Sequence, residues 1–320
     1  MNTKVINLRK PLLEQLLNNA ILNSMSWAMD NCCKRPQEPD YIAAMSLKFP
    51  KDLFKILQLT FLNEEFSVTG VYCHQKPIVD INEVKRPELG DLLLVYIGED
   101  YKRKKIMNSL LLQAKITNTL EKEISSNEYH QLKLYTEWPE FTYHRAGCLN
   151  GIRRNIFPKT ITDGAQYLLI DDNPYTNGMD GDIEKFPMGC AIPGSILMCN
   201  DSFSNEIINF LKFKSGRICD VDYHNTKDEW SKMIWDLLRI SCGQFSKRKN
   251  AGLYRFPRKN ECKRFYTKHM EEESIIYDLL QEGENIDSDG ETGVSVIIIE
   301  NNHFRNNYDG GREWDYFNYN

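Results

Sequence analysis

Two apolar segments joined by a short basic connector constrain the fold of this chain more than any other feature. Residues 91–98 (DLLLVYIG) and 109–116 (SLLLQAKI) have the length and composition of strands in a sheet core. Residues 99–108 between them are polar and rich in lysine and arginine. A connector of this kind has the character of a hairpin, so we expect the two segments to pair as neighbouring strands.

The first eighty residues predict two helices and a further strand. Residues 11–30 carry apolar residues at helical spacing, and Pro11 suits the first turn of a helix. A second helix is predicted at residues 50–63. Residues 66–79 are rich in β-branched and aromatic side chains and predict a strand that stops at Pro77.

A helix and a buried strand follow the two apolar segments. Ser125 and Glu128 have the spacing of a capping box, which predicts a helix that runs to about Glu137 and ends before Pro139. Residues 164–172 predict a strand apolar enough to be buried on both faces of a sheet.

This order of elements predicts an α/β fold, with a central mixed sheet flanked by helices, over residues 1–172. The strand–helix–strand step favours a parallel, right-handed crossover, and an antiparallel meander is open to the first three strands. Residues 173–300 are expected to form an accessory α+β extension that recognises substrate or a partner, with an amphipathic helix at 228–240. Residues 301–320 are expected to form a tail.

Composition argues against a membrane protein, a secreted protein and a zinc protein. No apolar run reaches the roughly 18 residues of a membrane span, and the N-terminal sequence lacks the apolar core of a secretory signal, so we expect no membrane association and a cytoplasmic location. The nine cysteines are scattered without a CxxC pair, which argues against a zinc site. The net charge of −5 argues mildly against passive binding of nucleic acid.

Two charge blocks of opposite sign follow one another in the C-terminal half. Residues 247–268 carry nine lysines and arginines against one acid, Glu261, and residues 271–291 carry nine acids and no lysine or arginine. Aromatic residues interleave with the cations, a pattern that can stack bases while neutralising phosphates. The alternatives are a nucleic-acid surface, an acidic block that covers the basic one until substrate displaces it, and two ordinary solvated surfaces.

Three polar residues mark the ends of the two apolar segments. Gln113 and Lys115 are two apart and therefore face the same side of a strand, and pairing of the segments brings Asp91 beside them. Asp91 and Gln113 offer oxygen ligands to Mg²⁺, and Lys115 can position an attacking water and stabilise charge on a phosphate. The pattern suits metal-dependent phosphodiester cleavage, with solvated strand ends as the plain alternative.

The order of elements, with an aspartate on one strand and QAK on the next, resembles the core of the PD-(D/E)xK nuclease superfamily. The glutamine variant is similar to the Mrr-type restriction endonucleases. In the following helix Gln131 and Tyr135 share a face, and this Gln-x-x-x-Tyr spacing resembles the motif of RecB-type nucleases. The resemblance covers residues 11–172.

The resemblance implies a restriction-endonuclease-like core, and a Mg²⁺- or Mn²⁺-dependent nuclease that acts on DNA in preference to RNA, in restriction or anti-phage defence. It implies catalytic roles for Asp91, Gln113 and Lys115, and contact of Gln131 and Tyr135 with nucleic acid. Members often add a further ligand, for which the candidates are Glu14, His74 and Glu88.

Other readings stay open. A catalytically inactive module that binds nucleic acid or a protein partner is the main alternative, because Gln113 removes one negative charge from the metal site. A regulatory protein whose acidic block docks a basic partner is another. No GxxxxGK[ST] phosphate loop is present, so any ATP hydrolysis or trigger requires a partner protein. A homo-oligomer is also open.

Overall fold

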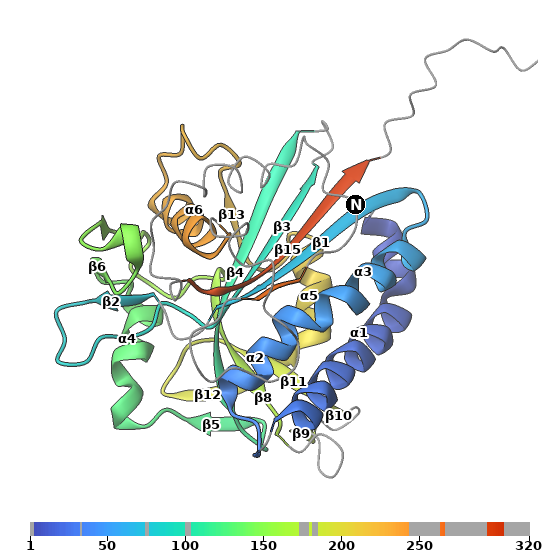
Figure 1. The fold of residues 1–320 in the computed structure, drawn as a ribbon, viewed down its shortest axis with the longest axis horizontal. Helices are drawn as coiled ribbons and strands as arrows, with labels where there is room; N and C mark the ends of the chain where they lie inside the picture. The colour runs from blue at the N-terminus through green and yellow to red at the C-terminus, as the bar shows by residue number, and fades with distance from the viewer. Residues whose placement is uncertain are drawn as a thin grey trace, which may run out of the picture.

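A ten-stranded mixed sheet flanked by helices organises the chain into an α/β fold (Figure 1). The computed structural model describes residues 3–32, 34–73, 77–99, 104–172, 179–180, 185–242, 263–265 and 293–303. The predicted α/β class, with a central mixed sheet between helices, is confirmed.

Among the residues that the structure describes, three helices precede the first strand, and three more lie between later strands. They are α1 (Thr3–Asn31), α2 (Glu38–Leu47), α3 (Phe49–Thr60), α4 (Tyr129–Glu137), α5 (Phe203–Leu211) and α6 (Glu229–Cys242), with short 3₁₀ turns η1 (Ser126–Glu128) and η2 (Gly147–Leu149). None of the helices in the described ranges is long and apolar enough to cross a membrane.

The large sheet runs in the order β14-β1-β15-β3-β4-β8-β11-β12-β5, and β13 pairs with β4. Its strands are β1 (Glu64–Tyr72), β3 (Leu92–Glu99), β4 (Lys105–Ile116), β5 (Glu121–Glu123), β8 (Ala165–Ile170), β11 (Met188–Ala191), β12 (Ile196–Ser202), β13 (Arg217–Cys219), β14 (Lys263–Phe265) and β15 (Ser295–His303). Two small sheets are formed by β2 (Ile78–Asp80), β6 (Phe141–His144) and β7 (Arg153–Arg154), and by β9 (Met179–Asp180) and β10 (Lys185–Phe186).

The central strands pair as the sequence predicts. Strands β3 and β4 form an antiparallel hairpin in which Leu92 lies opposite Leu112, and β4 is parallel to β8, which follows it after α4. Strand β4 begins at Lys105, four residues earlier than predicted, because its pairing with β3 extends as far as Glu99 opposite Lys105. The capping box at Ser125 and the helix end before Pro139 are also confirmed.

The first three strands do not form the antiparallel meander that the sequence left open. Strand β15 lies between β1 and β3, antiparallel to β1 and parallel to β3. Its apolar run, residues 296–299, is buried from both faces, which suits a central position better than the edge of a sheet. The sheet therefore crosses the boundary predicted after residue 172, and the predicted tail begins inside β15.

The first helix also differs from its prediction. Helix α1 starts at Thr3, so Pro11 lies inside it instead of in its first turn. The additional turns bury the side chain of Ile6, and the free energy of this burial offsets the cost of the backbone hydrogen bond that Pro11 cannot donate. The segment predicted as one strand at 66–79 is divided into β1 and β2, and α2 was not predicted at all.

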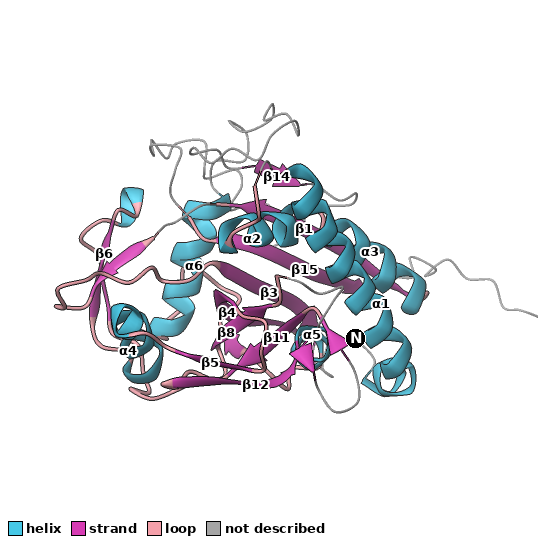
Figure 2. Ribbon diagram, turned by 90° about the horizontal axis from the view of Figure 1, so that it is seen from below, coloured by secondary structure: helices cyan, strands magenta, loops and turns pink. Residues whose placement is uncertain are grey.

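Two hydrophobic cores lie on opposite faces of the sheet, and alternate residues of the central strands supply both. Leu92, Leu94 and Leu112 pack against α1, α2, α3 and α5, whereas Leu93 and Leu111 face α4 and α6. Figure 2 shows α1–α3 and α4 with α6 on opposite sides of the strands. This alternation fixes which side chains of β4 reach the α4 side.

Candidate active site

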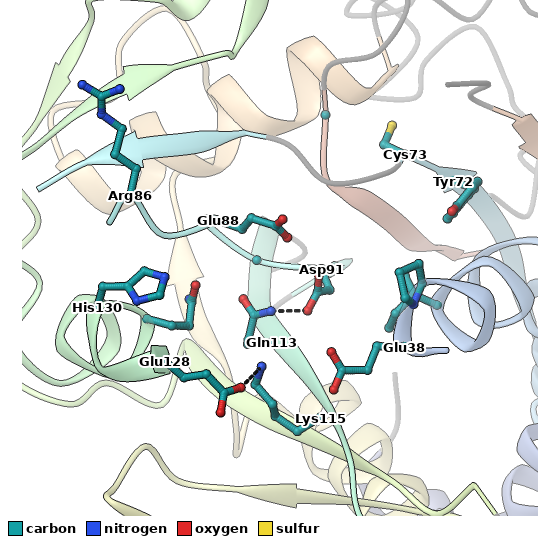
Figure 3. A pocket seen from close by; sticks show the side chains of 15 residues that line it. Glu38, Tyr72, Cys73, Arg86, Glu88, Asp91, Gln113, Lys115, Glu128 and His130 are labelled. Carbon is teal, nitrogen blue, oxygen red and sulfur yellow. Dashed lines mark hydrogen bonds and ion pairs between the residues drawn. The ribbon is translucent and has the colours of Figure 1, made fainter. Parts of the chain in front are cut away.

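A hollow of about 280 Å³ opens where β3 begins and β4 ends (Figure 3). Its walls come from the start of α2, the end of β1, the segment before β3, the end of β4 and the start of α4. Most of the lining is polar, and the charged or amide side chains are those of Glu38, Arg86, Glu88, Asp91, Gln113, Lys115, Glu128, His130 and Gln131. We refer to this hollow as the site cavity.

Asp91 and Gln113 are in direct contact in the site cavity. Asp91 precedes β3, and its backbone N–H donates to the carbonyl of Leu112 on β4 at 2.9 Å. Its Oδ2 accepts from the backbone N–H of Ala114 at 2.7 Å and from Nε2 of Gln113. The strand pairing therefore brings together the two residues that the sequence places 22 positions apart.

Lys115 shares the face of Gln113, because Ala114 between them points into the opposite core. Its Nζ lies 2.6 Å from Oε1 of Glu128, just before α4, and its side chain is 11% exposed. Figure 3 shows this ion pair beside the Asp91–Gln113 contact, with the Glu38 carboxylate turned toward the same space. The three predicted residues thus surround one cavity.

Burial shapes the charge state of the two innermost acids. It raises the pKa of Asp91 to about 8, and the neighbouring Glu88 adds to the rise, while the hydrogen bond from Ala114 opposes it. Burial also raises the pKa of Glu88, against the attraction of Lys115. Two acids that share one buried space favour the protonated form of each other until a cation joins them.

In the Lys115–Glu128 pair, by contrast, the surroundings favour the charged form of both groups. Burial alone lowers the pKa of Lys115, but the attraction of Glu38 and Glu128 outweighs it, so the net pKa is raised. Burial likewise opposes ionisation of Glu128, yet the bonds from Lys115 and Ser125 lower its pKa to about 2. Both groups are therefore charged over the whole neutral range.

Glu38 is one of the cavity residues that the sequence did not reveal as part of the site. The others with a charged or imidazole side chain, among the described residues, are Arg86, Glu128 and His130. Glu38 is the first residue of α2, and its Oε1 accepts from the backbone N–H of Ile116, one residue beyond Lys115, at 3.0 Å. The only local signal is the QEPD stretch, in which Pro39 marks the start of a helix. No spacing within the chain connects that helix start with β4.

The three further ligand candidates, Glu14, His74 and Glu88, have different outcomes. Glu14 lies on α1, where its Oε1 accepts from Oγ of Ser202 at 3.3 Å, and it does not line the site cavity. Glu14 lies away from the cavity because α1 packs against α3 and α5, whereas α2 is the helix that reaches the end of β4. His74 lies outside the described residues, whereas Glu88 does line the cavity.

Gln131 and Tyr135 share a helix face but have different surroundings. Gln131 lines the site cavity, is 5% exposed, and its Nε2 has no hydrogen-bond partner among the described residues. Tyr135 is fully buried, stacks on Trp138 at 5.6 Å, and its hydroxyl donates to the carbonyl of Leu89 at 3.0 Å. Tyr135 thus supports the segment that carries Asp91 instead of facing the cavity.

The donor chemistry of the site cavity fits a hard divalent cation. Oε1 of Gln113 is buried beside the Asp91 carboxylate and finds no hydrogen-bond partner in the part of the chain that the structure describes, and Glu38 and Glu88 add further oxygens. Oxygen ligands of this kind suit Mg²⁺ or Mn²⁺. Across the described ranges, however, no three His, Cys, Asp or Glu side chains already stand as a metal-binding group. An ion would have to draw Glu38 or Glu88 toward Asp91.

No protein-family model, curated protein or solved structure matches this chain.

Proposed function

We propose that this chain is a metal-dependent nuclease with a restriction-endonuclease-like core, and that the site cavity hydrolyses phosphodiester bonds of DNA in preference to RNA. The observation that carries the proposal is the direct contact of Asp91 with Gln113, with Lys115 on the same face of β4. Solvated strand ends do not account for an aspartate with a raised pKa that is hydrogen-bonded to an amide with an orphaned buried oxygen.

Each residue has a distinct role in this proposal. Asp91 and Gln113 would hold Mg²⁺ or Mn²⁺, together with Glu38 or Glu88. The metal, when bound, supplies positive charge that stabilises the phosphate during hydrolysis. Lys115 points at the same space, orients the attacking water by hydrogen bonding, and stabilises negative charge on the phosphate oxygens. Glu128 and Glu38 keep Lys115 protonated and in place.

A second candidate function is a catalytically inactive module that binds nucleic acid or a protein. The observation in its favour is that, within the part of the chain described, the acids of the cavity do not form a ready metal-binding group. A buried orphan amide oxygen next to Asp91 opposes it, since an inactive site gains nothing from leaving that oxygen unpaired.

Incubation of the protein with supercoiled plasmid, linear duplex, single-stranded DNA and RNA tests the proposal. Each substrate is combined with Mg²⁺, Mn²⁺ or a chelator. The proposal predicts cleavage of at least one DNA substrate with either metal and none with chelator. Binding without cleavage in every metal condition supports the inactive module instead. A role in restriction or anti-phage defence is part of the proposal, and plaque counts on cells that carry the chain or its Lys115→Ala variant test it.

A further inference from the structure

A second hollow continues from the site cavity along the start of α4. It has a volume of about 320 Å³, and His130 lines both hollows. Two segments line it: residues 83–85, and the start of α4 with the turn before it, which contributes Asn127, Tyr129 and Lys133. We refer to this second hollow as the side groove.

The side groove carries the chemistry that recognises a nucleic-acid strand. Lys85 is exposed and donates to Oδ1 of Asn127 at 2.9 Å, and Lys133 lies 2.5 Å from Oε1 of exposed Glu83. The two cations come from the two segments that line the groove. Their present partners are a neutral amide and an exposed carboxylate, both of which a phosphate can replace at little cost.

Tyr129 supplies a flat surface at the same place. It is the first residue of α4, is 53% exposed, and lines the side groove. An exposed ring next to two cations suits a base that stacks on it while the adjoining phosphates meet the lysines. A base inside a duplex has both faces covered, so only an unpaired base can make this contact.

The depth of the site cavity points to the same kind of substrate. Gln113 is 6% exposed and the Lys115 side chain is 11% exposed, so a phosphate must enter the cavity to reach them. A flexible single strand can enter such a cavity at less cost than a duplex, which must be bent or kinked to bring a phosphate to the same depth.

We propose that the side groove binds the nucleotide adjoining the scissile phosphate and that the substrate is single-stranded DNA. This inference rests on the proposed function. Lys85 and Lys133 contact its phosphates, and the ring of Tyr129 stacks on its base. His130, which lines both hollows, marks the point at which the strand passes into the site cavity.

Binding of labelled 20-nucleotide strands to the full chain tests the proposal. Affinity is measured by fluorescence anisotropy at several salt concentrations in chelator, with duplex DNA and single-stranded RNA as further arms. Lys85→Ala combined with Lys133→Ala should lower the slope of log K against log salt by about 1.4, since each phosphate contact on a single strand contributes roughly 0.7. Tyr129→Ala should weaken binding by about tenfold, and Tyr129→Phe should retain it.

Matched variants separate these contacts from structural effects. Glu83→Gln breaks the same ion pair as Lys133→Ala but leaves the cation, so it should bind single strands at least as tightly as the wild type. Lys51→Ala with Lys55→Ala removes two exposed lysines of α3, on the other side of the sheet, and should change neither affinity nor salt slope. Thermal unfolding of each variant reports its folding.

The outcomes distinguish the side groove from the proposed nuclease activity. Cleavage by the wild type with unchanged affinity in the lysine and tyrosine variants overturns the side groove and leaves the nuclease proposal standing. The expected losses of affinity without any cleavage by the wild type overturn the nuclease proposal and support the side groove as a binding site. Wild-type protein that binds no single strand, or binds duplex more tightly, overturns the side groove.

Discussion

The ammonium of Lys115 lies 2.6 Å from the carboxylate of Glu128 and joins the end of β4 to the turn that begins α4. This contact fixes the position of a lysine that the proposal places at the phosphate. Glu128 also closes the capping box with Ser125, so one carboxylate both orients the lysine and starts the helix.

The coupling between Lys115 and Glu128 is measurable as stability. Removing either side chain leaves a partly buried charge without its nearest partner, so Glu128→Ala should cost about 1–2 kcal/mol of unfolding free energy. A double-mutant cycle with Lys115→Ala, measured by urea unfolding, should give a coupling of about 1 kcal/mol. Ser125→Ala controls for the loss of the cap. If the change in unfolding free energy of the double variant equals the sum of the two single changes, the pair does not contribute to stability.

The pH dependence of this pair has a defined sign. The folded pKa of Glu128 is lowered to about 2, below its ordinary value of 4.5. Its ionised form is therefore the one that the fold stabilises, and this contribution is present above pH 4.5 and lost as the pH falls toward 2. The stability difference between the wild type and Glu128→Gln should shrink across that window. A stability difference between the two proteins that stays constant from pH 6 to pH 2.5 contradicts the lowered pKa of Glu128.

Gln113→Glu replaces the amide that contacts Asp91 with a second carboxylate. Repulsion between the two acids should lower the melting temperature without metal, and a divalent ion that bridges them should restore it. We expect a larger Mg²⁺-induced rise in melting temperature than in the wild type, with cleavage kept or increased. Gln166→Glu, on β8 beside Glu206, is a matched control that gains a carboxylate pair outside the cavity. Equal metal responses in all three proteins argue against a metal at Asp91.

Glu38 and Glu14 form a natural comparison, because each is a glutamate on an N-terminal helix and only Glu38 lines the site cavity. Glu38→Gln should lower cleavage by at least about tenfold, since it removes a cavity oxygen and one of the charges that hold Lys115. Glu14→Gln should leave the cleavage rate unchanged. Initial rates on one DNA substrate at fixed Mg²⁺ decide the matter, and equal rates for the two variants would exclude Glu38 from the site.

Tyr135→Phe tests whether this buried ring supports the site or contacts substrate. It leaves the carbonyl of Leu89 without its donor, so we expect a loss of about 1 kcal/mol in stability. The affinity for DNA should be unchanged, because Tyr135 is fully buried. Weaker DNA binding with unchanged stability would show that the ring reaches substrate, as the RecB-type resemblance implies.

Local signals predicted the part of the fold around β3 and β4 well. The apolar runs on either side of the basic connector, the Ser125 capping box and the strand at 164–172 each depend on neighbours in sequence, and they appear as β3, β4, α4 and β8. The alternation of residues along β4 was enough to place Gln113 and Lys115 on one face. Their contact with Asp91 followed from the hairpin pairing.

Long-range pairing accounts for most of what was missed. Strand β15 enters the sheet between β1 and β3 from more than 190 positions beyond β3, and nothing in the run VSVIIIE specifies which strands it joins. Glu38 reaches the end of β4 only because α2 packs there, which depends on tertiary contacts. Tyr135 was assigned to substrate on motif spacing alone, whereas its burial depends on Trp138 and Tyr167. The charge blocks at 247–268 and 271–291 lie outside the described residues except for β14, which pairs with β1.

The most direct test of the account compares metal-dependent DNA cleavage by the wild type with that of Asp91→Asn and Lys115→Met, all purified identically. Asp91→Asn keeps a side-chain oxygen for the Ala114 N–H, and Lys115→Met keeps the length of the side chain, so both variants should fold. Lys122→Ala, on β5, controls for the loss of a lysine outside the cavity. We expect cleavage by the wild type and Lys122→Ala with Mg²⁺, none with chelator, and a loss of about 100-fold or more in each site variant. Cleavage that persists in folded Asp91→Asn and Lys115→Met, or no metal-dependent cleavage by the wild type on any nucleic acid, contradicts the account.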